Sequence, residues 1–221
     1  MLRKTTLRKA SPYVLLVLLL MVGSLAASCA RREPPAPTPP PTSTPEAAPA
    51  PPPVLTSNAP PLVAANFDTC TGTNNLGGPV GAAYNPPDSL KESYVDEANR
   101  GCVARLEYTI TGWSAFWMKL QSADLTPYSK LVFDVRADPQ PGIPRQMKLE
   151  LKRAGEVSIK YVAGIGADWK TISVRLADFG SAGYGATVSS WQGMEELTFT
   201  FEANQSGREA VVYLDHIVFE R

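Results

Sequence analysis

The chain has 221 residues, of which 21 are basic and 21 acidic, so its formal net charge is zero. Without a basic excess or a basic tract, it lacks the electrostatic footprint of a protein that binds nucleic acid, and we expect no such partner. Cys70 and Cys102 are widely spaced, and with a single histidine in the chain they do not make a zinc site.

Residues 1–28 have the features of a secretory signal. Four basic residues in the first nine positions precede an apolar run from Tyr13 to Val22, which is too short to span a membrane comfortably. The small residues after this run end at Cys29 and resemble the lipobox of bacterial lipoproteins, with Leu25 one place earlier than that pattern prefers. This resemblance implies cleavage, acylation of Cys29 and an extracytoplasmic, membrane-anchored protein. Cleavage would leave 17 basic against 21 acidic residues. An uncleaved anchor and an ordinary signal peptide are the alternatives.

Residues 29–61 are dominated by Pro, Ala, Thr and Ser. Such a composition cannot bury a core and favours extended polyproline II conformations, which act as semi-rigid spacers. We therefore expect a disordered linker that holds the folded part away from the lipid surface. A docking site for a polyproline-binding domain is the alternative.

Residues 62–221 predict one all-β domain. In the stretch 168–179, apolar Ile172, Val174 and Leu176 alternate with polar residues, as in a strand with one buried and one wet face. No convincing amphipathic helix intervenes. About nine strands are expected: near 62–68, and at 103–110, 115–120, 130–137, 145–153, 156–162, 169–176, 196–202 and 210–220. Many short strands separated by turn signals indicate an antiparallel β-sandwich or jelly roll, with 71–101 as a long loop.

Cys70 and Cys102 form an even pair once Cys29 is set aside. In an exported and oxidising compartment, such a pair is expected to form a disulfide, and two buried free thiols are the alternative. Closing a loop of this length would stabilise the fold by roughly 3 kcal/mol.

Five segments in order carry a resemblance to a known family: 66–68, 75–78, 125–136, 169–179 and 212–219. This series resembles the galactose-binding-like β-sandwich domains, in particular the carbohydrate-binding modules of family 11 and the related complex I intermediate-associated protein domain. The resemblance covers residues 62–221. It implies a jelly roll that binds a glycan without cleaving it, often with a structural calcium ion.

The densest aromatic segment, 113–118, offers the flat faces that sugar recognition needs. In a strand, Trp113 and Trp117 share one face, while Phe116 and Met118 share the other. We expect Phe116 and Met118 to enter the core and Trp113 or Trp117 to lie on or near the binding face. Packing of both tryptophans under loops is the alternative. Tyr84, together with Tyr94 and Tyr184, is a further candidate because it lies in a glycine-rich loop region.

Polar side chains at alternate strand positions could bind sugar hydroxyl groups. Asp134 and Arg136 occupy one predicted strand, and Lys148 and Glu150 the next. On adjacent strands they would form a ladder of mixed charge across the sheet. The alternative is an ordinary solvated face with cross-strand ion pairs.

Asp68 and Asp215 lie in the first and last expected strand regions, which resemble the positions that share a metal ion in related modules. Calcium prefers several carboxylate and carbonyl oxygens, so these two are the candidate ligands of a structural calcium ion. His216 stands where a second acid is common after the last Asp. Two aspartates that cap turns or pair with arginines are the alternative.

An enzyme is not expected. His216 is the only histidine, and no serine elbow or second histidine is present to build a nucleophilic triad. Our interpretation is a surface lipoprotein whose β-sandwich binds a polysaccharide or cell-wall glycan non-catalytically. The alternative is a protein-interaction or assembly module of the same fold.

Overall fold

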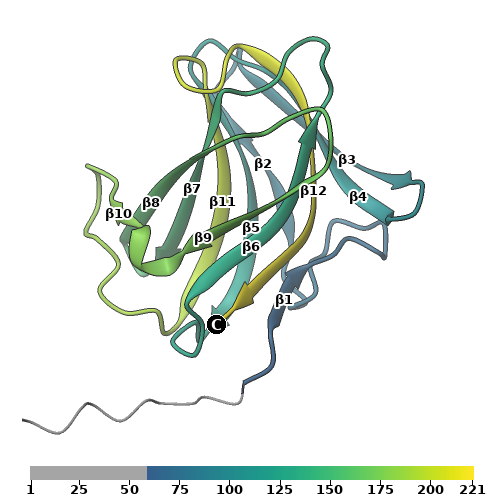
Figure 1. Cartoon of the computed structure of the whole chain (residues 1–221). Coiled ribbons are helices and arrows are strands. Elements are labelled where there is room, and N and C mark those ends of the chain that lie inside the picture. Colours follow the sequence, from purple (N-terminus) through teal and green to yellow (C-terminus); the bar gives the residue numbers. More distant parts are fainter. Residues whose placement is uncertain (1–58) are drawn as a thin grey trace, which may run out of the picture. The chain divides into compact units, whose positions relative to one another are not determined.

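The structure is a computed structural model, and it describes residues 59–221. The predictions for the signal peptide, Cys29 and nearly all of the linker lie outside the described residues. Residues 59–221 form two antiparallel sheets packed face to face, with one short 3₁₀ turn at Leu176–Asp178 (Figure 1). The predicted all-β sandwich is confirmed. No helix within this part of the chain is long and apolar enough to cross a membrane.

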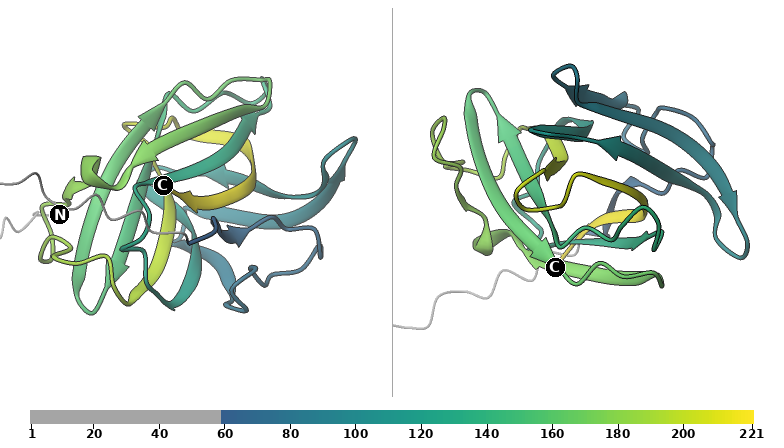
Figure 2. Two further views of the ribbon diagram at one scale, coloured as in Figure 1. Left: turned by 60° about the horizontal axis from the view of Figure 1, so that its bottom comes forward. Right: turned by 90° about the horizontal axis from the view of Figure 1, so that it is seen from above.

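Each sheet contains six strands. The first sheet has the order β3 (Ser89–Glu97), β4 (Gly101–Thr109), β12 (Glu209–Glu220), β6 (Lys130–Ala137) and β9 (Lys170–Arg175), and β1 (Leu62–Ala65) also pairs with β12. The second sheet has the order β10 (Gly180–Ser181), β8 (Glu156–Ala163), β7 (Gln146–Arg153), β11 (Met194–Glu202), β5 (Trp113–Ala123) and β2 (Val80–Tyr84). The β3–β4 hairpin lies at one side of the domain and β7, β8 and β10 at the other (Figures 1 and 2).

The segment 71–101 is not one long loop, because it contains β2 and β3. Both are edge strands, one in each sheet. The sequence of β2 is short and rich in small residues, and β3 is only partly buried along most of its length. An edge strand with one wet side and few large apolar residues carries little alternation, which explains why the pattern missed both.

The core lies between the inner faces of the two sheets. Phe116 and Met118 on β5 are fully buried, as predicted, and Phe199 on β11 packs near Phe116. Phe133 on β6 meets Phe199 edge to face across the sandwich, with ring centroids 5.4 Å apart. Because Phe116 and Met118 point into the core, the other face of β5, which carries Trp113 and Trp117, lies on the outside of the second sheet.

The Cys70–Cys102 disulfide is present, as predicted, and its Cα atoms are 5.5 Å apart. It ties the segment between β1 and β2 to the start of β4. Trp169 packs against a small buried cluster of Val103, Val211 and Tyr213 on the first sheet. Trp191 packs against the main core, beside Phe179.

Candidate functional site

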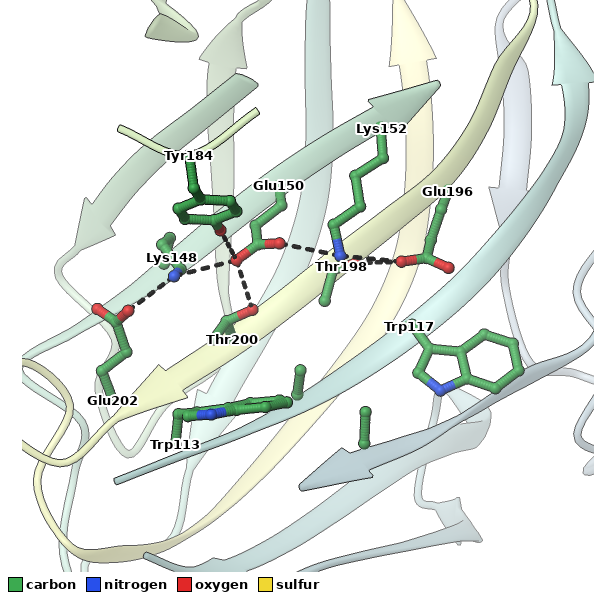
Figure 3. A pocket seen from close by; sticks show the side chains of 12 residues that line it. Trp113, Trp117, Lys148, Glu150, Lys152, Tyr184, Glu196, Thr198, Thr200 and Glu202 are labelled. Atoms are coloured by element: carbon green, nitrogen blue, oxygen red, sulfur yellow. Dashed lines mark hydrogen bonds and ion pairs between the residues drawn. The ribbon is translucent and has the colours of Figure 1, made fainter. Parts of the chain in front are cut away.

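A groove of about 410 Å³ lies on the outer face of the second sheet (Figure 3). Three strands of the sheet, β5, β11 and β7, supply most of its lining, and edge strand β2 and the segment after β10 complete it. Its lining residues are Ala83, Trp113, Ala115, Trp117, Lys148, Glu150, Lys152, Tyr184, Glu196, Thr198, Thr200 and Glu202.

Two tryptophans of β5 form the aromatic side of the groove. Trp113 is exposed to 38%, and Trp117 is partly exposed. Trp117 can lie over β2 because its cross-strand neighbour is Gly81, where an added Cβ would come 2.6 Å from the indole Cζ2. The two indoles lie in different planes, Trp113 nearly edge-on and Trp117 face-on in the same view (Figure 3). They therefore offer two separate platforms rather than one flat surface.

Small side chains form the floor between these platforms. Thr200 on β11 pairs with Ala115 on β5, and Ala115 pairs with Ala83 on β2, so the three form one row across three strands. This row falls between the positions of Trp113 and Trp117 along β5. The groove is thus deep where the row of small residues crosses the strands and is walled by large residues on either side.

A chain of alternating charges forms the other side. Six side chains from β5, β11 and β7 alternate in sign, and each contacts the next at 2.6–3.0 Å: Lys119, Glu196, Lys152, Glu150, Lys148 and Glu202. Cross-strand register explains the order, since Lys152 lies opposite Glu196 and Lys148 opposite Thr200. Three lysines and three glutamates balance, so the network has no net charge.

Glu150 is the centre of this network and is only 5% exposed. Its carboxylate contacts Lys148 at 3.0 Å and Lys152 at 2.9 Å, and it accepts hydrogen bonds from the hydroxyls of Tyr184 and Thr200. Burial opposes ionisation of Glu150, but the charges of Lys152 and Lys148 outweigh it, and the pKa of Glu150 lies below its ordinary value. A buried carboxylate with this many partners is held in one place and stays charged.

Burial and neighbouring charges also oppose each other at the groups on either side of Glu150. Burial opposes ionisation of Glu196 as well, yet Lys119 and Lys152 bring its pKa below the ordinary value. Burial also opposes the charge of Lys148, but Glu202 and Glu150 raise the pKa of this ammonium group. The groove therefore presents fixed donors and acceptors of both signs to a ligand, without a net field that would attract an ion.

Four of the predicted ligand-binding residues are brought together: Trp113, Trp117, Lys148 and Glu150 all line the groove. Tyr84 is 43% exposed but does not line it. It pairs with Ser114, whose side chain is buried, so it belongs to the opposite face of β2 at the end of that strand.

Asp134 and Arg136 are on the other sheet, so they do not form one ladder with Lys148 and Glu150. Strand β6 pairs with β12 and β9, and β7 pairs with β11 and β8, although β6 and β7 are consecutive in the sequence. Asp134 is ion-paired with Arg100, and Arg136 with Glu97 and Asp138.

Strand β11 contributes residues that the sequence reasoning did not single out. Glu196, Thr198, Thr200 and Glu202 alternate along it, and all four line the groove. The alternation of polar and apolar residues along β11 is the feature of the sequence that could have identified them. Tyr184, named only as a further candidate, reaches the groove from the segment after β10, and its hydroxyl donates to Glu150.

Two shallower hollows adjoin the groove. One, of about 440 Å³, shares Trp113 and Glu202 with it and reaches Asn204 and Gln205. The other, of about 350 Å³, shares Lys152 and Tyr184 and reaches Arg153. The concave surface therefore continues beyond the central groove on both sides.

Asp68 and Asp215, the candidate calcium ligands, lie outside the groove. The Asp215 carboxylate accepts the backbone N–H of His216 at 2.7 Å and lies 3.6 Å from Arg100. Burial raises the pKa of Asp215, and the charges of Asp134 and Asp68 act in the same direction. Within residues 59–221, no group of three or more His, Cys, Asp or Glu side chains is placed to hold a metal ion. A calcium ion here would depend on these two carboxylates and on backbone oxygens, and it would compete with Arg100.

No family model and no curated protein matches the sequence. The fold is a two-sheet antiparallel β-sandwich. It is similar to the family 11 carbohydrate-binding module of the cellulosomal cellulase Lic26A-Cel5E of Clostridium thermocellum, with a TM-score of 0.61 and 13% identity over 74% of this chain and 96% of that one.

Two other solved structures share this fold. A family 11 module from Clostridium thermocellum in complex with a β-1,3-1,4-mixed-linked tetrasaccharide matches with a TM-score of 0.54 and 15% identity, over 64% of this chain and 88% of that one. An exo-β-agarase matches with a TM-score of 0.52 and 11% identity, over 72% of this chain but only 25% of the enzyme. These similarities establish the fold of residues 62–221.

Proposed function

We propose that the domain binds a neutral polysaccharide or cell-wall glycan in the groove and does not cleave it. One observation carries this proposal: two accessible indoles stand beside a fully paired, charge-neutral network of lysines and glutamates. Aromatic faces suit the apolar side of a pyranose, and hydroxyl groups both donate and accept hydrogen bonds. A neutral polyol uses both kinds of group, whereas an ionic ligand would have to break an existing ion pair.

The spacing of the platforms supports an oligosaccharide rather than a single sugar. Trp113 and Trp117 are four residues apart on β5, which corresponds to roughly 13 Å along an extended strand. This distance is longer than one pyranose ring. A chain of several sugars could contact both indoles and the charged network on the other side of the groove.

The state of the carboxylates supports binding without hydrolysis. Glycoside hydrolysis needs one carboxylic acid with a raised pKa to protonate the leaving group. Glu150 and Glu196 instead have lowered pKa values, because lysines contact both. They are held as anions and serve as hydrogen-bond acceptors.

The experiment is a glycan-binding screen of the domain, followed by titration of tryptophan fluorescence. The β-1,3-1,4-mixed-linked tetrasaccharide seen with the similar module is the first probe, with neutral and uronic-acid polysaccharides beside it. We expect saturable binding of a neutral glycan, weakened but still measurable in Trp113→Ala and in Trp117→Ala, and unchanged in Tyr84→Ala, an exposed aromatic outside the groove. A folded domain that binds no glycan would overturn the proposal and favour a protein partner.

We also propose that the full chain is an extracytoplasmic lipoprotein, anchored to a bacterial membrane through acylated Cys29 and carried on the linker 29–61. The support is the sequence pattern of residues 1–28. Mass spectrometry of the mature protein should find an acylated N-terminal cysteine. Cys29→Ser should release the protein from the membrane fraction, and a variant that stays there unacylated would contradict the proposal.

We also propose a structural calcium ion at Asp68 and Asp215. The support is that the negative charge of Asp68 raises the pKa of Asp215, so the two carboxylates interact. If it binds, the melting temperature in calcium exceeds that in chelator, because a ligand of the folded state stabilises it. Asp215→Asn should remove the difference. Equal melting temperatures would end the proposal.

A further inference from the structure

Asp88 stands outside the groove, in the segment between β2 and β3, and is 7% exposed. Its carboxylate accepts four hydrogen bonds from the turn between β4 and β5. Oδ1 accepts from the backbone N–H and the hydroxyl of Thr111, at 2.7 and 2.9 Å. Oδ2 accepts from the backbone N–H groups of Gly112 and Trp113, each at 2.9 Å. One carboxylate thus satisfies three consecutive backbone donors of a single turn.

The turn is built around this carboxylate. A Cβ on Gly112 would come 2.9 Å from Asp88 Oδ2, so only glycine leaves room for the contact. The carbonyl of Gly112 in turn accepts the N–H of Ala203, just beyond the end of β11. The turn is therefore held by two contacts: Asp88 binds its N–H groups, and the backbone of Ala203 binds its carbonyl at Gly112.

The bond from the backbone N–H of Trp113 connects Asp88 to a residue that lines the groove. Trp113 is the first residue of β5 and the more exposed of the two indole-bearing residues. A side chain at the end of a strand has fewer cross-strand neighbours to define its direction than one in the middle. Trp117, in the middle of β5, is paired on both sides, with Gly81 and with Thr198. The backbone N–H of Trp113 instead depends on Asp88.

We propose that Asp88 is a positioning residue for ligand binding: it fixes the backbone at Trp113, and so the indole, without touching the ligand. This inference rests on the proposed glycan binding in the groove. A carboxylate is required, because four donors converge on two oxygens and an amide would turn one acceptor into a donor.

The test is a double-mutant cycle in glycan binding, read by fluorescence titration. Asp88→Asn should weaken binding roughly tenfold, the loss expected when buried donors lose an acceptor. In the Trp113→Ala background it should weaken binding no further, whereas in the Trp117→Ala background the tenfold loss should persist. An equal loss in both backgrounds, or no loss in a folded Asp88→Asn variant, would overturn the proposal.

A ligand-free readout separates this inference from the proposed function. The difference in acrylamide quenching between a protein and its Trp113→Ala variant reports how accessible Trp113 is. We expect Asp88→Asn to change this difference even if no glycan binds. Asp124→Asn is the matched control, because Asp124 also caps a turn, through the N–H of Thr126 at 2.9 Å, but lies outside the groove lining. An unchanged Trp113 signal in Asp88→Asn would refute the positioning role.

A milder variant covers the case in which Asp88→Asn does not fold. Thr111→Val removes only the hydroxyl bond to Oδ1 and leaves the three backbone bonds. It should weaken binding roughly two- to fivefold, less than Asp88→Asn does because the three backbone bonds remain, and only when Trp113 is present. The same loss without Trp113 would count against the proposal.

Discussion

Glu150→Gln tests whether the charge network of the groove also stabilises the fold. The glutamine has nearly the same shape, so it removes a negative charge without leaving a cavity. Lys148 and Lys152 then lose their shared partner, and the new amide N–H₂ faces one of the two ammonium groups. Because Glu150 is nearly fully buried, water cannot replace the lost charge.

The size of the effect follows from the remaining partners. Breaking a buried ion pair costs about 3–5 kcal/mol when the other charge is left alone. Here Lys148 keeps Glu202 at 2.7 Å and Lys152 keeps Glu196 at 3.0 Å. We therefore expect the free energy of unfolding of the variant to fall by about 2–3 kcal/mol, which is at or below the lower end of that range. For a domain of this size, this loss lowers the melting temperature by roughly 4–12 °C.

Urea unfolding at pH 7 measures this loss, and Glu107→Gln is the control. Glu107 pairs with Arg105 on the first sheet, but its side chain is 50% exposed, so its loss should cost less than about 0.5 kcal/mol. If Glu150→Gln cost no more than Glu107→Gln, the network would not stabilise the domain, and the reasoning would fail.

The pH dependence gives a second check. The folded pKa of Glu150 lies below the ordinary value of 4.5, so the unfolded chain takes up a proton first as the pH falls. The stabilisation by the carboxylate is complete above about pH 4.5 and is lost as the pH falls through the folded pKa. The difference between wild type and Glu150→Gln should therefore shrink in acid. A difference that grew there would contradict this assignment.

Three further predictions concern other parts of the domain. Gly81→Ala should displace the indole of Trp117, because the new Cβ overlaps the ring, and should lower the free energy of unfolding in urea by about 1–3 kcal/mol. Gly180→Ala is the control, because a Cβ there meets open space, and it should cost far less. Replacing both cysteines of the disulfide by serine should cost about 3–4 kcal/mol, and a loss below 1 kcal/mol would count against the entropic estimate for a separation of 32 residues. Glu92→Gln should stabilise the domain slightly at pH 7, by less than about 1 kcal/mol because the side chain is only partly buried, since burial raises the pKa of this carboxyl and its Oε2 has no hydrogen-bond partner. The gain should vanish below about pH 4.5, where both side chains are neutral.

Much of the candidate site was predictable strand by strand. Alternation along β5 predicts that Trp113 and Trp117 share the face opposite Phe116 and Met118, because successive strand residues point to opposite sides. Strand length and turn signals also predicted the sandwich. Edge strands β2 and β3 were missed, since their wet sides and small residues break the pattern.

The sequence by itself determined which residues share a face within each strand, because that depends only on the two-residue repeat of an extended backbone. The tertiary structure alone decided which strands lie side by side. Asp134 and Arg136 look equivalent to Lys148 and Glu150 in the sequence, yet β6 and β7 belong to different sheets. Pairing is set by contacts between distant segments, which local alternation does not encode. The groove exists because β11 brings its threonines between the tryptophans of β5 and the lysines of β7.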